Sequence, residues 1–181
     1  GGPVLDLRGC DYDLSGSWRN AAGGEGAPEA VAIPVSVEFD EAEKAFVFFE
    51  GGDVLRVPLA TNPQHMRAVS YAAWVKVPRK PQNLAWLMSQ HPDYGWSRAL
   101  ALNDYRLGNV SISTSRYWDS GLGPVPVQEW VHVVGVWDAG AECTAYLNGR
   151  RGDSTSANNG KGADVDEELV IGGRAPYDSA H

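Results

Sequence analysis

The sequence predicts an all-β protein, an antiparallel β-sandwich of about eleven or more short strands. Short apolar or alternating runs recur along its 181 residues, whereas no segment with a helical period extends beyond about two turns. The composition agrees, because 21 Gly, 11 Pro, seven Trp and seven Tyr suit many strands joined by tight turns. A chain of this length can enclose one continuous core, so we expect a single domain over residues 1–181.

The strands are placed from the positions of these runs. Residues 130–138 (WVHVVGVWD) are the clearest case, because both alternating faces are mostly apolar, which predicts a central strand buried on two sides. Residues 15–30 and 149–166 are rich in glycine and lack a period, so we expect surface loops there. The expected strands are 3–8, 31–39, 45–49, 54–58, 68–77, 83–90, 97–102, 105–114, 130–138, 142–148 and 167–172.

Composition and charge exclude several classes of protein. Hydrophobic residues (43%) and charged residues (21%) are near the average for globular proteins, which argues against disorder and membrane insertion. The net charge of −8 repels phosphate backbones and anionic lipids, so nucleic acid is not an expected partner. The start, Gly1-Gly2-Pro3, lacks a signal-peptide pattern, which is consistent with a cleaved or engineered end. Cys10 and Cys143 are either two thiols on strands or one disulfide.

Strand parity predicts where a binding site would lie. If successive strands run antiparallel, the connections 59–67, 91–96, 115–129 and 149–166 fall at one end, and 78–82, 103–104 and 139–141 at the other. The first end collects the long loops, and recognition residues concentrate on long loops held by a rigid scaffold. We therefore expect a ligand-binding site formed by His91, Asp93, Tyr94, Trp96, Arg116, Tyr117, Trp118 and Asp119.

Several motifs resemble one family. Residues 130–138, followed by 145–149 (AYLNG), resemble the "W-hhV-x-V-x-D, then Y-h-N-G" hairpin of laminin G-like and other concanavalin A-like domains. Residues 46–58 resemble its "L-x-F-x-G-x-D-Y-V-x-V-P" strand pair, and residues 70–78 its "F-S-I-S-A-W-V-K" strand. Further matches are Asp13 to Gly16 with Asn20, which resemble the "D-L-S-G-N-G" loop, and 169–173, which resemble the late "L-x-I-G" strand.

The resemblance, which spans roughly residues 5–173, implies a jelly-roll sandwich in an extracellular or cell-surface protein. Such domains usually close with a "G-x-I-D-E-V-R-I-Y" strand, and this sequence stops at His181 without one. We therefore expect a piece of a larger protein, with a sheet edge that is open to a partner by strand addition.

The resemblance also implies calcium, which members of the family often bind through carboxylates and backbone carbonyls in loops. The matching positions are Asp13 and Asp53, and both lie in glycine-containing loops that suit a hard cation. The acidic run Asp164, Asp166, Glu167 and Glu168 is another candidate. Solvated acidic surface is the alternative explanation for all of these residues.

The aromatic residues of the expected loops suit a sugar. Flat rings cover the apolar side of a pyranose, while Asp and Arg side chains bond its hydroxyl groups. Tyr94, Trp96, Tyr117 and Trp118, with Asp93 and Arg116, provide that combination. Trp96 and Trp118 would alternatively pack beneath their own loops.

Two other motifs give alternative functions. Glu38 and Glu43 match the E-x-D-x-x-E spacing of glucanases, whose retaining mechanism needs two carboxyl groups about 5 Å apart. Residues 41–44 read instead as a polar turn, so an enzyme is not expected. Arg151-Gly152-Asp153, the cell-adhesion tripeptide, is expected in an exposed loop.

The leading interpretation is a non-catalytic module that recognises a glycan or a protein surface through the long loops, with calcium as the candidate cofactor. A glycoside hydrolase using Glu38 and Glu43 is the second interpretation. A structural assembly domain that presents its open sheet edge to another chain is the third.

Overall fold

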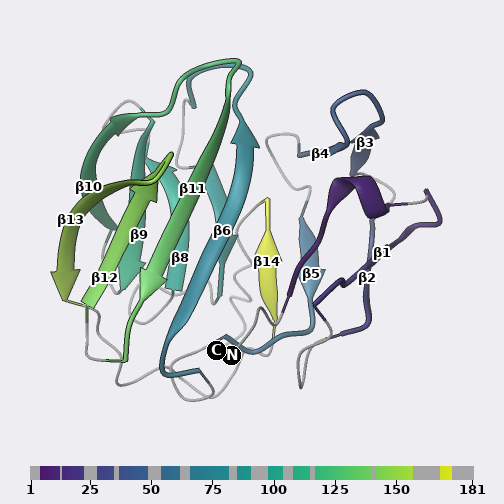
Figure 1. The fold of residues 1–181 in the computed structure, drawn as a ribbon, viewed down its shortest axis with the longest axis horizontal. Helices are drawn as coiled ribbons and strands as arrows, with labels where there is room; N and C mark the ends of the chain where they lie inside the picture. Colours follow the sequence, from purple (N-terminus) through teal and green to yellow (C-terminus); the bar gives the residue numbers. More distant parts are fainter. Residues whose placement is uncertain are drawn as a thin grey trace, which may run out of the picture.

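The computed structural model is a two-layer β-sandwich (Figure 1). It describes residues 5–12, 14–22, 28–34, 37–48, 54–61, 66–81, 85–90, 98–103, 108–114, 117–139, 142–156 and 168–172. Within these ranges it contains one 3-10 helix, Gly9–Asp11, and no helix long and apolar enough to cross a membrane. The strands are β1 (Ser17–Arg19), β2 (Ala30–Ala32), β3 (Glu38–Asp40), β4 (Ala45–Val47), β5 (Leu55–Val57), β6 (Val69–Lys76), β7 (Ala85–Ser89), β8 (Arg98–Asn103), β9 (Asn109–Thr114), β10 (Tyr117–Pro124), β11 (Trp130–Trp137), β12 (Glu142–Leu147), β13 (Arg150–Ser156) and β14 (Leu169–Ile171).

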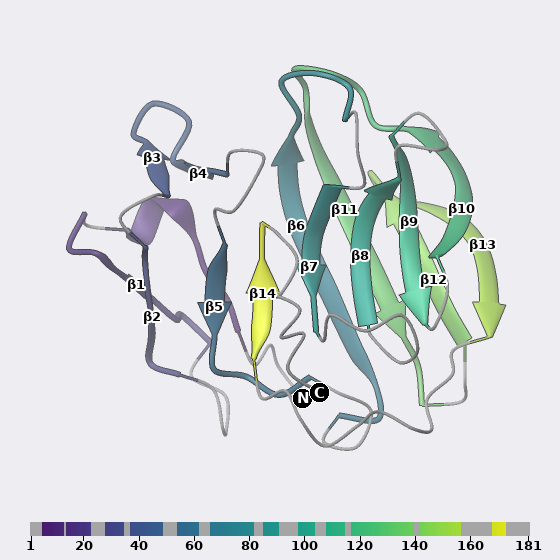
Figure 2. The ribbon, with the colours of Figure 1, turned by 180° about the vertical axis from the view of Figure 1, so that it is seen from behind.

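The two layers are antiparallel sheets that face each other. One has the order β10-β9-β8-β7-β14-β5, and the other has the order β13-β12-β11-β6. Figure 2 shows the six-stranded layer in front of the four-stranded layer. The predicted antiparallel sandwich is therefore confirmed.

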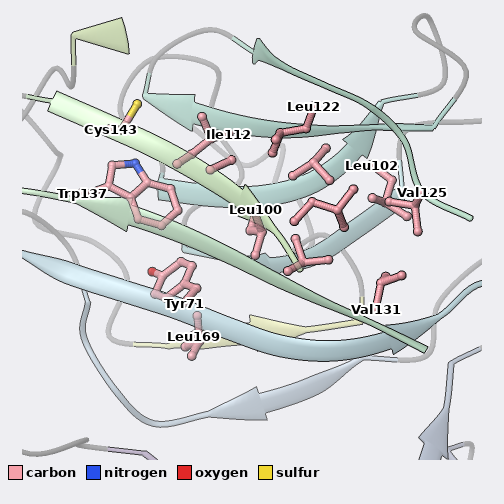
Figure 3. Packing of buried hydrophobic residues seen from close by; sticks show 14 of the residues in the cluster. Tyr71, Leu100, Leu102, Ile112, Leu122, Val125, Val131, Trp137, Cys143 and Leu169 are labelled. Atoms are coloured by element: carbon pink, nitrogen blue, oxygen red, sulfur yellow. The ribbon is translucent and has the colours of Figure 1, made fainter. Parts of the chain in front are cut away.

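The core lies between the layers and is built from alternate residues of each strand. On β11, Val131, Val133 and Trp137 are 1% exposed or less, and they belong to one core cluster with Leu100 and Ile112 of the other sheet. Figure 3 shows Trp137 within this cluster. The rings of Trp137 and Tyr71 lie 4.9 Å apart between centroids. Burial of such side chains is the main favourable term that holds the layers together.

A smaller assembly lies beyond β5, on the opposite side of the molecule from β10 and β13 (Figure 1). It consists of two two-stranded sheets, β1-β2 and β3-β4. The rings of Tyr12, Trp18, Phe39 and Phe46 pack together, with centroid distances of 4.2 to 4.9 Å. Their contacts fix the β3-β4 hairpin, whose turn at residues 41–44 agrees with the predicted polar turn.

Several strand predictions were wrong. Residues 5–8 form no ladder, the expected strand 31–39 is two strands separated near Pro34, and the expected loop 15–30 contains β1 and the start of β2. The prediction also missed β10 and β13. A register shift in β10 breaks the alternation that would have revealed it, and the sequence of β13 is almost entirely polar.

The prediction that residues 130–138 are buried on two sides was also wrong. The odd positions of β11 point into the core, whereas its even positions are half-buried or exposed on the outer surface of the sheet. Apolar residues on an outward face do not by themselves indicate a covering layer.

The missed strands also change which connections share an end of the sandwich. The end of β11 pairs with the start of β6, and Arg98 at the start of β8 pairs with Thr114. Arg98 also donates to the carbonyl groups of Thr61 and Met66, just before β6. We call this end of the sandwich the base.

The strand ends at the base are those that flank 59–67, 91–96, 115–116, 138–141 and 157–168. Residues 125–129 and the turn at 148–149 lie at the other end, contrary to the prediction. Residues 138–139 follow the end of β11 at the base, whereas the prediction put 139–141 at the other end.

Cys10 and Cys143 are not joined by a disulfide in the structure. Cys143 is fully buried on β12, and Cys10 is exposed in the 3-10 helix. Of the two alternatives left by the sequence, the disulfide is therefore wrong.

Candidate functional site

The outer surface of the four-stranded sheet carries a group of aromatic side chains on β6 and β11. In the register of these strands, His132 lies opposite Trp74, and Trp130 lies opposite Lys76. Opposite residues of an antiparallel ladder point to the same side, with Cβ atoms about 5 Å apart. Trp74, Lys76, Trp130 and His132 therefore form one continuous patch, which we call the aromatic face.

The rings of this face are held in place and open to solvent. Trp74 is 65% exposed and Trp130 is 38% exposed. The imidazole of His132 lies beside the indole of Trp74, with 5.1 Å between centroids and 33° between ring planes. The backbone of His132 is fixed by Asn148, whose side-chain Oδ1 accepts from the His132 N–H at 2.8 Å. A rigid apolar surface left open to water is typical of a recognition surface.

One end of the aromatic face is charged. The Lys76 ammonium lies 5.9 Å from the centroid of the Trp130 ring, within the range of a cation–π interaction. Glu43, from the turn of the β3-β4 hairpin, accepts from Lys76 Nζ at its Oε1 and from Trp130 Nε1 at its Oε2, both at 2.8 Å. The carboxylate thus links the small assembly to the main sheet.

These contacts determine the protonation state of Glu43. The pKa of the Glu43 carboxyl group is lowered, mainly by the hydrogen bond from Lys76. The hydrogen bond from Trp130 and the positive charge of Lys76 lower it further. Glu43 is therefore a carboxylate at neutral pH, and it compensates the charge of Lys76.

The glucanase interpretation needs a different arrangement. A glycosidase acid is kept protonated by a raised pKa, whereas that of Glu43 is lowered. Glu38 lies in β3 opposite Val47, at the far end of the hairpin from the turn that carries Glu43. The geometry gives Glu43 a role in charge compensation and speaks against its use as a general acid.

Most of the predicted loop site lies outside the described residues. This applies to His91, Asp93, Tyr94, Trp96 and Arg116.

The other three predicted residues were expected in a loop and lie in β10. Tyr117 and Trp118 pair with Ser113 and Ile112 through their backbones. Asp119 accepts from the N–H of Gly121 and from Asn109 Nδ2, two groups of its own sheet.

A buried polar network joins the strands at the base. Arg98 is 2% exposed, and its guanidinium donates to the carbonyl groups of Thr61, Met66 and Arg67 at 2.6 to 3.1 Å. Thr61 is hydrogen-bonded in turn to Tyr71 and to Gln90 through its hydroxyl group. The network fixes the strand ends from which the predicted binding loops depart.

The calcium positions Asp13 and Asp53 lie outside the described residues, as do Asp164, Asp166 and Glu167. Glu168 is described and forms an ion pair with Arg56 at 2.8 Å. Across the described ranges, no group of three or more His, Cys, Asp or Glu side chains is arranged to hold a metal ion.

The adhesion tripeptide is not in a loop, contrary to the prediction. Arg151, Gly152 and Asp153 lie within β13, an edge strand that also packs against β10. A Cβ atom at Gly152 would lie 2.5 Å from the carbonyl oxygen of Ser120, so the strand is pressed against its neighbour there. Arg151 and Asp153 are therefore held along a strand and are not presented together at the tip of a loop.

Reasoning from the sequence missed the aromatic face, although a signal was present. The alternate residues Ser70, Ala72, Trp74 and Lys76 give β6 one side with three small or polar residues and a single Trp. A lone Trp on an otherwise polar side of a strand indicates an exposed ring.

Residues 49–180 match the family model of the concanavalin A-like lectin/glucanases superfamily. No curated protein sequence matches the chain.

Solved structures resemble it in fold. The binding domain of botulinum neurotoxin serotype D superimposes with a TM-score of 0.66 at 17% identity, over 93% of this chain and 43% of that one. The serotype D ligand-binding domain in complex with N-acetylneuraminic acid gives 0.62 at 16%, over 93% and 42%. The binding domain of Paraclostridial Mosquitocidal Protein 1 gives 0.65 at 16%, over 94% and 44%. The chain thus spans less than half the length of these structures.

Proposed function

Because the chain belongs to the concanavalin A-like lectin/glucanases superfamily, we propose that it is a non-catalytic module that binds glycans through its aromatic face. The observation that carries this proposal is the exposed indole of Trp74, held beside His132 on the outer surface of the sheet. A fold of this kind serves many functions, so the proposal rests on the surface and not on the fold.

The chemistry of the face suits a sugar. An indole ring offers a flat apolar surface for the C–H side of a pyranose, and the ring adds little conformational entropy cost because few of its bonds rotate. The polar groups of His132, Lys76 and Glu43 lie around the rings, where they can bond hydroxyl groups. One of the similar structures is a complex with a sugar, which supports this class of ligand.

The test is a glycan array probed with the wild-type protein and with Trp74→Ala. Loss of the stacking surface should weaken binding by about three- to tenfold or more, the size of a specific aromatic contact. Leu14→Ala is the matched control, since Leu14 is also an exposed large apolar residue (56%) and lies in the small assembly. Equal binding by all three proteins, or no binding by the wild type, would contradict the proposal.

The site predicted from the sequence, which comprises the loop residues His91 to Trp96, Arg116 and the first residues of β10, remains an alternative location for the same function. It is tested by the same array through Trp96→Ala, which should leave binding unchanged if the aromatic face is the site. Binding of calcium through Asp13 and Asp53, an extracellular location, a protein partner and strand addition at a sheet edge also remain proposals. A second array run with a chelator tests the calcium proposal, because a calcium-dependent site would lose its signal.

A further inference from the structure

Lys76 is the only Lys, Arg, Asp or Glu among the outward residues of β6 and β11. These residues are Ser70, Ala72, Trp74, Lys76, Trp130, His132, Val134 and Val136. Lys76 lies at one end of the face and is about one-third exposed, so a ligand in contact with Trp130 would also reach its ammonium group.

Glu43 is hydrogen-bonded to the two donor groups that could otherwise bind an acidic ligand. One carboxylate oxygen accepts from Lys76 Nζ, and the other accepts from the indole N–H of Trp130. A carboxylated sugar placed here would meet the carboxylate of Glu43 together with the ammonium of Lys76. An uncharged sugar would contact an ion pair whose charges cancel, so its binding energy would include no Coulomb penalty.

We infer that Glu43 is a specificity-determining residue that makes the aromatic face select uncharged glycans over acidic ones. The inference rests on the proposed function and adds the substrate class to it. The net charge of −8 acts in the same direction, because it repels acidic polysaccharides at long range.

Glu43 is well placed for this role because its turn is fixed. Asp40 Oδ1 accepts from the backbone N–H groups of Ala42 and Glu43, at 2.9 and 3.0 Å. The strands on either side of the turn are held by the contact of Phe39 with Phe46, at 4.9 Å between centroids. The site is therefore composite, with rings from the main sheet and a carboxylate from the β3-β4 hairpin.

The test compares Glu43→Gln with Glu41→Gln on an array of neutral glycans and of glycans that carry uronic or sialic acids. Both substitutions remove one negative charge from the same turn, and Glu41 is exposed with no described side-chain contact. In Glu43→Gln the amide oxygen still accepts from Trp130 or Lys76, but Lys76 loses its compensating charge. The ratio of acidic to neutral binding should rise about two- to fivefold, the size of an exposed ion-pair interaction. Salt should reduce the gain.

A second variant tests the same inference from the side of Lys76. Lys76→Gln should change the ratio in the opposite direction, and Glu43→Gln with Lys76→Gln should abolish the gain. Thermal unfolding checks that each variant is folded. Equal ratios for Glu43→Gln and Glu41→Gln, or a wild type that prefers acidic glycans, would overturn the inference.

The two proposals fail in different ways. If Trp74→Ala binds like the wild type, the aromatic face is not the site, and the inference falls with the proposed function. If Trp74→Ala loses binding but Glu43→Gln leaves the ratio unchanged, the face binds glycans and only the role of Glu43 is wrong.

Discussion

Tyr71 is a buried polar residue whose ionisation depends on the hydrogen-bond network at the base of the sandwich. Its hydroxyl group is hydrogen-bonded to Thr61, which donates its own hydroxyl proton to Gln90, so Tyr71 must act as the donor in this chain. Burial raises the pKa of Tyr71 from 10.0 to about 12, and the hydrogen bond with Thr61 and the charge of Arg98 only partly oppose this. The folded protein therefore keeps the proton longer than the unfolded chain does.

The sign of the pH effect follows from this raised pKa. Below pH 10 both states hold the proton, and between about pH 10 and 12 the unfolded state loses it first, so stability falls as the pH rises. Tyr71 should account for a loss of up to about 3 kcal/mol across this window. Urea unfolding of the wild type and of Tyr71→Phe from pH 9 to 12 should show the smaller loss in the variant. Parallel curves would show that Tyr71 is not buried in this network.

The individual residues of the site could be predicted only in part. The sequence placed Trp74 and Lys76 in one strand, and Trp130 and His132 in another, but it did not indicate that the two strands are neighbours in register. Glu43 was considered only with Glu38, as one of a possible pair of catalytic carboxylates. Its contact with Trp130 joins residues 87 positions apart, and no local pattern encodes such a contact.

At the scale of elements, the β12-β13 hairpin is the clearest case of a turn encoded by its residues. Asn148 and Gly149 have φ angles of 49° and 79°, as a two-residue type I′ turn requires. The pair Asn-Gly between strands is the strongest short signal for such a hairpin, yet the polar sequence of β13 led to the prediction of a loop. The hairpin also carries the Asn148 side chain that fixes His132.

Substitution of Gly149 should test this turn. A Cβ atom at this position meets nothing within 4 Å, so a substitution acts through the backbone angle alone. Gly149→Val should destabilise the protein by about 1 to 2 kcal/mol, because β-branched residues avoid positive φ. Gly149→Asn should be nearly neutral, because Asn tolerates this region. Thermal or urea unfolding of the two variants measures the difference, and equal stabilities would contradict the assigned turn.

At the scale of the whole molecule, the fold was predictable because a sandwich repeats its signal in many strands. Strands β4 to β9, β11, β12 and β14 overlap the runs that the sequence indicated, and the match of residues 49–180 to the family agrees with the motifs found there. The end of the sandwich occupied by each loop was less predictable, since the missed strand β10 reverses the parity of the connections that follow it, and the missed strand β13 restores the parity for the residues after β13. The end at which each loop lies is decided by the pairing of strands in the fold, which the local sequence pattern does not reveal.

The central claim is that a glycan contacts the outer surface of the four-stranded sheet, on the aromatic face. The chain has seven Trp residues, and each gives one indole N–H signal in a nitrogen-15 NMR spectrum. A titration with the neutral oligosaccharide that binds best on the array should shift the signals of Trp74 and Trp130 and leave that of the buried Trp137 unchanged. Shifts of Trp96 and Trp118, with Trp74 and Trp130 unmoved, would contradict the claim and place the ligand on the predicted loops.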